Sequence, residues 1–184
     1  ISWSTLGSGV NNKVYALAVH NGILYAGGNF TTAGGNPVRK IASWNGTTWS
    51  DLPHGGINGS LNHVDALLSS AWGLVVGGAF NSVGNTPFTA NNIARWNPGP
   101  GWATFGNGFN GPVYALTHFN GNVTAGGRFG NSPGGLNNLA IWVGFWTKVG
   151  GGGAVNLSTT LNTSEGIYAI AQYKTELIVG GQFP

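Results

Sequence analysis

The chain contains no cysteine and no methionine, and charged residues make up only 6% of its 184 residues. The lack of cysteine excludes disulfides, thiolate metal ligands and cysteine nucleophiles. Seven basic and four acidic residues are too few for helices stabilised by rows of ion pairs. No apolar run approaches the roughly 20 residues of a membrane-spanning helix, so we expect no membrane span in this chain.

Glycine and asparagine, by contrast, are abundant, with 34 glycines and 22 asparagines. Hydrophobic residues reach 41% and include eight tryptophans, which is enough apolar surface to offset the entropy of ordering the chain. The net charge is +3 and the pI about 9.5, but only Arg39 and Lys40 place two bases side by side. Nucleic-acid binding usually needs clustered bases. We therefore expect an all-β protein with many turns and no nucleic-acid partner.

An internal repeat organises the sequence, and its clearest part is an apolar stretch followed by Gly-Gly, one further residue and Phe. This segment occurs four times, at residues 23–30, 73–80, 122–129 and 176–183. A Val-Tyr-Ala-Leu-like segment precedes each copy, starting at Val14, Val64, Val113 and Ile167. The repeats span approximately residues 1–48, 49–101, 102–145 and 146–184, the last being incomplete. A period near 50 residues indicates a repeat architecture.

Each repeat is predicted to hold four short strands, a to d, at 14–19, 23–27, 41–44 and 49–52 in the first copy. Asn-Gly pairs at residues 21–22 and 120–121 predict type I′ hairpins between strands a and b, and Asn45-Gly46 predicts the same between c and d. Four antiparallel strands per repeat are typical of a β-propeller blade. A β-solenoid is the alternative, but its coils are shorter and rarely contain a tight hairpin.

The glycine pairs and the tryptophans have expected places in such a propeller. Glycine lets neighbouring backbones approach closely and permits the positive φ of a bulge. The tryptophans of strands c and d are expected to fill the space between blades. Trp72 has no counterpart in the other repeats, and we predict that it is an exposed aromatic residue.

The Gly-Gly pair, followed by the spaced tryptophans Trp44 and Trp49, resembles a Kelch-type repeat. The stretch from Leu24 to Leu52 is similar to the Kelch-like branch found in bacterial secreted and surface proteins and in fungal cortical-marker ectodomains. The resemblance covers nearly the whole chain and implies a propeller of four-stranded blades. Such propellers are mostly scaffolds and binding modules, so the resemblance says little about function. The second repeat departs from it by placing Asp65 where the others have tyrosine.

The alternation of strand direction places the b–c and d–a loops on one face, and these loops are the long ones. Function tends to lie on loops held by a rigid scaffold. The candidate ligand-binding residues on this face are Arg39, Lys40, His54, His63, Asn156, Asn162 and Glu165. Loop 150–166 is the longest of the set.

Catalysis is not predicted. The four acids, Asp51, Asp65, Glu165 and Glu176, form no recurring pair of the kind that glycoside hydrolysis requires. The sequence lacks a G-x-S-x-G elbow, and the copper cofactor of the Kelch-type galactose oxidases needs a cysteine. His54 and His63 do not have a recognised metal-ligand spacing. We expect no cofactor and no metal.

Two functions remain open. A structural or adhesive module fits the low charge and the lack of oxidisable residues, and its partners would be copies of itself or surface proteins. A carbohydrate-binding propeller is the alternative, because tryptophan and asparagine side chains commonly hold sugars. Six N-x-[ST] motifs suggest a glycosylated extracellular or cell-surface protein, at Asn29, Asn45, Asn58, Asn122, Asn156 and Asn162.

The ends of the chain do not complete a ring. Residues 1–6 are predicted to be a lone strand d, and the last repeat stops after strand b. The chain begins with Ile1 rather than methionine. We expect a fragment of a propeller of about six to eight blades, with an unread segment or a strand donated by a neighbouring subunit as the alternatives.

Overall fold

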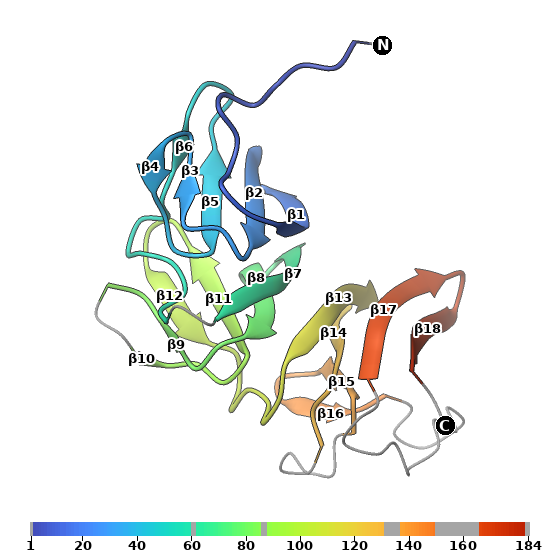
Figure 1. Cartoon of the computed structure of the whole chain (residues 1–184). Coiled ribbons are helices and arrows are strands. Elements are labelled where there is room, and N and C mark those ends of the chain that lie inside the picture. The colour runs from blue at the N-terminus through green and yellow to red at the C-terminus, as the bar shows by residue number, and fades with distance from the viewer. Residues whose placement is uncertain (1, 60–61, 86–87, 131–136, 150–165, 183–184) are drawn as a thin grey trace.

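The structure, a computed structural model, describes residues 2–59, 62–85, 88–130, 137–149 and 166–182. In these residues the protein is all-β, with three four-stranded antiparallel sheets that repeat every roughly 50 residues. A fourth, two-stranded antiparallel sheet follows them. Figure 1 shows the sheets following one another along an arc, from the blue first sheet to the red fourth one.

Each sheet is a meander that starts with a hairpin. The first sheet consists of β1 (Val14–His20), β2 (Ile23–Gly28), β5 (Ile41–Trp44) and β6 (Trp49–Ser50). The second consists of β7 (His63–Ser70), β8 (Gly73–Ala79), β11 (Ile93–Asn97) and β12 (Gly101–Thr104). The third consists of β13 (Val113–Phe119), β14 (Asn122–Gly127), β15 (Leu139–Trp142) and β16 (Trp146–Lys148). The fourth consists of β17 (Gly166–Tyr173) and β18 (Glu176–Gln182). These strands confirm the predicted order a, b, c and d in three repeats.

Two small hairpins lie inside the b–c connections, where only loops were expected. They are β3 (Thr32–Ala33) with β4 (Asn36–Pro37), and β9 (Ser82–Val83) with β10 (Phe88–Thr89). Two-residue strands are too short to produce a visible alternation of apolar and polar residues, so the sequence pattern did not reveal them.

The prediction of a strand d at residues 1–6 is wrong for residues 2–6, which contain no strand. A strand needs a neighbour to accept its backbone hydrogen bonds. Figure 1 shows the N-terminal segment leading away from the first sheet, while the fourth sheet lies at the other end of the arc. Strand β18 is therefore not beside these residues, and Trp3 is 98% exposed.

The a–b turns are of the predicted type, whereas the first c–d turn is not. Asn21 and Gly22 have φ of 50° and 77°, and Asn120 and Gly121 have 48° and 77°. At the c–d turn only Gly46 has a positive φ, of 100°. Trp44 pairs with Trp49, which leaves a four-residue connection. There the Oδ1 of Asn45 accepts hydrogen bonds from the backbone N–H groups of Thr47 and Thr48, both at 2.9 Å.

The first glycine of each Gly-Gly pair leaves room for the next sheet. A Cβ on Gly77 would lie 2.7 Å from Cγ1 of Val113, and a Cβ on Gly126 would lie 2.7 Å from Cγ2 of Ile167. A Cβ on Gly27 would overlap Val64 in the same way. Each sheet thus places a β-branched side chain of its first strand against the first glycine of the sheet before it. This contact is the repeated step by which consecutive sheets pack.

The second glycine of each pair leaves room for a bulge within its own sheet. A Cβ on Gly28 would overlap the carbonyl oxygen of Lys13, and a Cβ on Gly78 would overlap that of His63. The pairing register shifts at this place in all four a–b hairpins. None of these glycines has a positive φ. The expectation that the pairs supply positive φ is therefore wrong, and the space that a missing Cβ leaves is the reason for them.

In each four-stranded sheet a tryptophan of the last strand is hydrogen-bonded to the segment that leads into that sheet. The indole N–H of Trp49 donates to the carbonyl oxygen of Leu6 at 2.9 Å, that of Trp102 to Gly55 at 2.6 Å, and that of Trp146 to Phe105 at 2.7 Å. The rings pack beside buried apolar clusters that lie between and around the sheets. A buried indole both fills volume and satisfies its N–H, which suits a layer between two sheets.

We predict that Gly77→Val destabilises the fold by about 3 kcal/mol or more, because the new side chain would meet Val113 in a packed interface. Gly99→Val is the matched control, since a Cβ on Gly99 would meet nothing within 4 Å. Urea unfolding followed by tryptophan fluorescence measures both variants. A Gly77→Val protein with the wild-type midpoint would contradict the packing step described above.

Candidate functional site

The long loops of neighbouring repeats are joined by backbone hydrogen bonds on one face. The N–H of Ile57 donates to the carbonyl of Arg39 at 2.9 Å, and the equivalent bond runs from Phe109 to Asn91 at 2.9 Å. Isolated β-bridges join Val10 to Ala33 and Ile57 to Val83. These bonds confirm that the d–a and b–c loops share a face. The face is built as a cross-linked layer of loops.

Arg39 and Lys40, both candidate ligand residues, make internal contacts. The Nη2 of Arg39 lies 3.1 Å from Oδ2 of Asp51 and 2.5 Å from Oδ1 of Asn85, so the side chain joins two repeats. Lys40 is buried, has φ of 65° and donates from Nζ to Oδ1 of Asn29 at 2.9 Å. In this structure both cations hold the loop face together.

The two candidate histidines have different surroundings. His54 is exposed at the surface, with φ of 68°, and its Nε2 lies 3.2 Å from the carbonyl oxygen of Gly99. His63 is half-buried on β7, with its Nε2 3.2 Å from Oδ2 of Asp65 and its ring at the edge of Tyr15. In the part of the chain that the structure describes, no three His, Cys, Asp or Glu side chains gather as metal ligands.

The other candidates are placed as follows. Trp72 is 47% exposed, and the Arg95 guanidinium lies 6.0 Å from the centre of its ring. Of the N-x-[ST] motifs, Asn45 is exposed, whereas Asn29, Asn58 and Asn122 are partly buried and hydrogen-bonded. Asn156, Asn162 and Glu165 lie outside the described residues.

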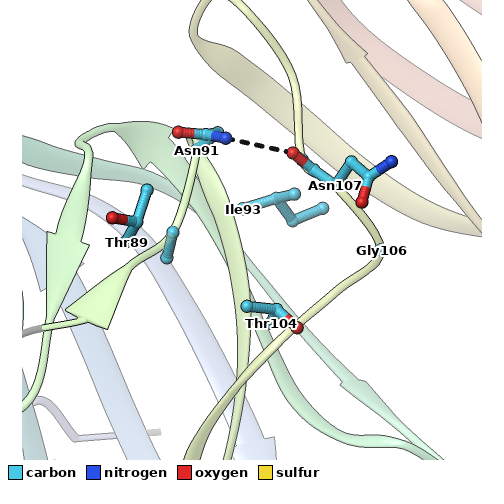
Figure 2. Close-up of a pocket in the computed structure, with 8 residues that line it drawn as sticks. Thr89, Asn91, Ile93, Thr104, Gly106 and Asn107 are labelled. Atoms are coloured by element: carbon cyan, nitrogen blue, oxygen red, sulfur yellow. Dashed lines mark hydrogen bonds between the residues drawn. The ribbon is translucent and has the colours of Figure 1, made fainter. Parts of the chain in front are cut away.

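A cleft of about 300 Å³ opens between the second sheet and the segment that leads to the third. It is lined by Thr89, Ala90, Asn91, Ile93, Thr104, Gly106, Asn107 and Gly108. Figure 2 shows the amide of Asn91 reaching across to the backbone carbonyl of Asn107, a hydrogen bond of 3.1 Å. The lining carries hydroxyl and amide groups and no charge, which suits a small neutral polar ligand.

The same position in the first sheet is filled. Asn91 corresponds to Arg39, because each lies two residues before the isoleucine that begins the third strand of its sheet. Thr104 corresponds to Asp51, because each lies two residues after the tryptophan of the fourth strand. The Arg39–Asp51 ion pair beside the first sheet therefore stands where the second sheet has an asparagine and a threonine. The second sheet thus has smaller side chains at these two positions, and the cleft lies beside them.

A second feature is a row of bulged residues. The register shift in the first strand of each sheet leaves one extra residue, and these residues are Tyr15, Asp65, Tyr114 and Tyr168. Bulges re-aim a side chain and are over-represented beside active sites. The first strands of consecutive sheets pack against one another, so these residues form one row, here named the bulge row.

Ring contacts join Tyr15 to His63, which lies beside the bulge row, and Tyr114 to Tyr168 within it. Tyr15 and His63 lie 6.0 Å apart between ring centres, and Tyr114 and Tyr168 lie 5.2 Å apart. Tyr15 and Tyr168 are about half exposed, so they present aromatic surface to solvent. Asp65 is the one acid in the row.

The surroundings of Asp65 are unfavourable for its charge. Burial raises the pKa of the Asp65 carboxyl to about 6, and His63 acts in the opposite direction. Its Oδ2 is buried and makes no hydrogen bond of good geometry with any described residue, although His63 is close. Burial also raises the pKa of Tyr114, with Arg128 opposing and Tyr168 and Asp65 adding to the rise. A site that retains an unfavourable charge is a candidate functional site.

Sequence reasoning placed the candidates on the loops and found neither the cleft nor the bulge row. One signal was visible, since Asp65 departs from the tyrosine of the other repeats. The cleft had no comparable signal, because it depends on which side chains meet across two separate segments.

Comparison with known proteins identified no family. No family model matches the chain, and no curated protein matches it. No helix in the described ranges is long and apolar enough to span a membrane.

We predict that Asp65→Asn stabilises the protein by about 1–3 kcal/mol above pH 6, the order of free energy that corresponds to the raised pKa of Asp65. The folded chain binds this proton more tightly than the unfolded chain, so ionisation of Asp65 lowers stability as the pH rises from 3.8 to about 6. The stabilisation by Asp65→Asn should therefore vanish below about pH 4, where the carboxyl is protonated in both the folded and the unfolded chain. Thermal unfolding at pH 4 and pH 7.5 measures it.

Asp51→Asn is the control for that measurement, because Asp51 is paired with Arg39 and its loss removes a favourable contact. It should bring no gain at pH 7.5. Equal stabilisation by Asp65→Asn at both pH values would disprove the account of Asp65.

Proposed function

We propose that the chain is a run of β-propeller blades that serves as a non-enzymatic scaffold or adhesion module at the cell surface or outside the cell. The repeated packing step supports the propeller, because each sheet meets the next through the same glycine and the same β-branched position. A sheet order of a-b-c-d, with first strands packed on first strands, is that of propeller blades.

The observation that carries the function is the cross-linked loop face. Backbone bonds such as that from Ile57 to Arg39 hold loops of different repeats in fixed relation. Asn85 accepts a hydrogen bond from Arg39 and donates its N–H to the carbonyl of His54 at 2.7 Å. A surface fixed in advance loses little entropy on binding, which favours recognition of another protein.

The acids are arranged in keeping with a scaffold. Asp51 is engaged with Arg39, and Glu176 begins β18 beside the a–b turn. Asp65 lies near the start of β7, at the opposite end of the strands. These three carboxylates are thus not gathered at one place for acid–base chemistry.

An array experiment tests this proposal. The labelled chain is applied to an array of purified extracellular domains from its source organism. We expect saturable binding to one or more domains, weakened by Arg39→Gln, which breaks the contacts to Asp51 and Asn85, and unaffected by Asn45→Ala on the opposite, turn face. No binding to any domain, or binding equally affected by both variants, would overturn the loop-face proposal.

Carbohydrate binding is the second candidate, and the cleft favours it. Hydroxyl and amide groups of Thr89, Asn91 and Thr104 line a space of about 300 Å³, the size of a small ligand. The half-exposed tyrosines of the bulge row offer aromatic faces of the kind that stack on sugar rings.

The first repeat suggests how to close the cleft. Asn91→Arg combined with Thr104→Asp copies the Arg39–Asp51 pair, so it should fill the cleft and preserve the fold. On a glycan array we predict that the wild type binds a neutral glycan and that the double variant binds at least about tenfold more weakly. Binding unchanged in the double variant but lost in Tyr168→Ala would assign the sugar to the bulge row instead.

A further inference from the structure

Inside the chain, consecutive sheets pack through a protruding half, the β-branched residue of a first strand, and a receiving half, the first glycine of the preceding Gly-Gly pair. The first sheet of the arc exposes a protruding half, and the fourth sheet exposes a receiving half. On the first sheet the protruding half is free, since Val14 and Leu17 are 41% and 63% exposed. Their counterparts on the second sheet, Val64 and Leu67, are 0% and 9% exposed because the first sheet covers them. The equivalence follows from the aligned strands β1 and β7.

The receiving half is free on the fourth sheet. Among the described residues, a Cβ on Gly180 would meet only the Cβ of Ala169, at 3.8 Å, an ordinary contact within its own hairpin. Its counterparts Gly77 and Gly126 are filled by side chains of the next sheet. Ile178 beside it is 49% exposed, whereas the equivalent Tyr25 is 2% exposed.

Further apolar surface surrounds the free protruding half. A groove of about 630 Å³ runs along this face and is lined by Val14, Leu17, Ala26, Trp49 and the segment 5–10. Inside the chain, the equivalent residues of the second sheet belong to a continuous apolar core with the first sheet. The groove is therefore an unfilled copy of an interface that the chain already forms.

We propose that a second copy of this chain docks head-to-tail, with Val14 and Leu17 of one copy packed against Gly180 of the other. The three contacts inside the chain indicate which residues would cover each face. The residue that packs on Gly27, Gly77 or Gly126 is in every case β-branched and is followed three positions later by a second aliphatic residue. The β1 strand of a second copy supplies that pattern at Val14 and Leu17. The inference rests on the propeller plan proposed above.

The arithmetic of the ring favours two copies. In the described residues one chain provides three four-stranded sheets and the two-stranded fourth sheet, besides the small hairpins β3–β4 and β9–β10. Two copies therefore bring together eight sheets that follow the repeat. Propellers close with about four to eight blades. A head-to-tail contact closes into a ring when its rotation fits and otherwise continues as a filament. Docking would also bring Tyr168 of one copy beside Tyr15 of the other and extend the bulge row.

Sedimentation velocity of the whole chain tests the proposal. We expect a species of twice the 18.9 kDa chain mass at micromolar concentration. Gly180→Val should weaken the association at least about tenfold, because it fills the receiving space. The same variant should keep the stability of the wild-type monomer, because space is open at Gly180 and its φ is not positive.

Leu17→Lys tests the protruding face of the first sheet, because it places a positive charge in the proposed contact. Val143→Lys is its matched control, an exposed apolar residue in the third c–d turn. Leu17→Lys should be monomeric and Val143→Lys should associate as the wild type does. Circular dichroism confirms in each case that the fold is retained.

Mixing the two variants gives the decisive result. A Leu17→Lys chain keeps an intact Gly180 face, and a Gly180→Val chain keeps an intact Val14 and Leu17 face. An equimolar mixture should therefore regain dimers that neither variant forms alone. A wild-type chain that stays monomeric at about 100 µM, or a mixture that does not regain dimers, would overturn the proposal and assign these faces to further repeats of a longer chain.

The outcome is separable from that of the proposed function. The arrays use the labelled chain at nanomolar concentration, where association is negligible for an interface of micromolar affinity. Dimers together with no binding on the arrays would support head-to-tail docking and contradict the loop-face proposal. Binding on the arrays without dimers would support the loop-face proposal and contradict head-to-tail docking.

Discussion

The structure depends on the missing Cβ at the first glycine of each Gly-Gly pair. At Gly77 and Gly126 the next sheet inserts a β-branched side chain into the space that a larger residue would occupy. Cores of this kind are packed as closely as crystals, so the distance between sheets is set by that contact and has little freedom. The indole hydrogen bonds from Trp102 and Trp146 then tie each sheet to the segment that connects it to the preceding sheet. Because the step is the same each time, the sheets follow one another along a regular arc.

The repeated order of strands could be predicted from the sequence, because the Gly-Gly segment and the segment before it each occur four times at a similar spacing. The strand order, the Asn21-Gly22 hairpin and the shared face of the long loops all follow from local patterns of two to eight residues. The turn at Asn45 differs because its length is set by the pairing of Trp44 with Trp49, which no local signal reveals. The cleft was beyond prediction for the same reason, since its walls come from segments that meet only in the folded chain.

Two departures from the repeat mark candidate functional positions. Asp65 replaces a tyrosine and introduces an unfavourable charge into the bulge row. Asn91 and Thr104 stand where the first sheet has the ion pair of Arg39 and Asp51, and they line a cleft. Natural proteins break a local rule mainly at functional or strained sites. Both departures belong to the second sheet and the loops beside it, which makes that sheet the candidate site under the proposed binding function.

The two free faces at the ends of the arc follow from the same constraint that orders the interior. A repeat that buries its apolar face only against its neighbours must leave one protruding face and one receiving face at the ends of any open run. Val14 and Leu17 at one end, and Gly180 at the other, are those faces. The proposed docking of a second copy uses the same contact that orders the sheets within the chain, with a β-branched side chain placed against the first glycine of a Gly-Gly pair.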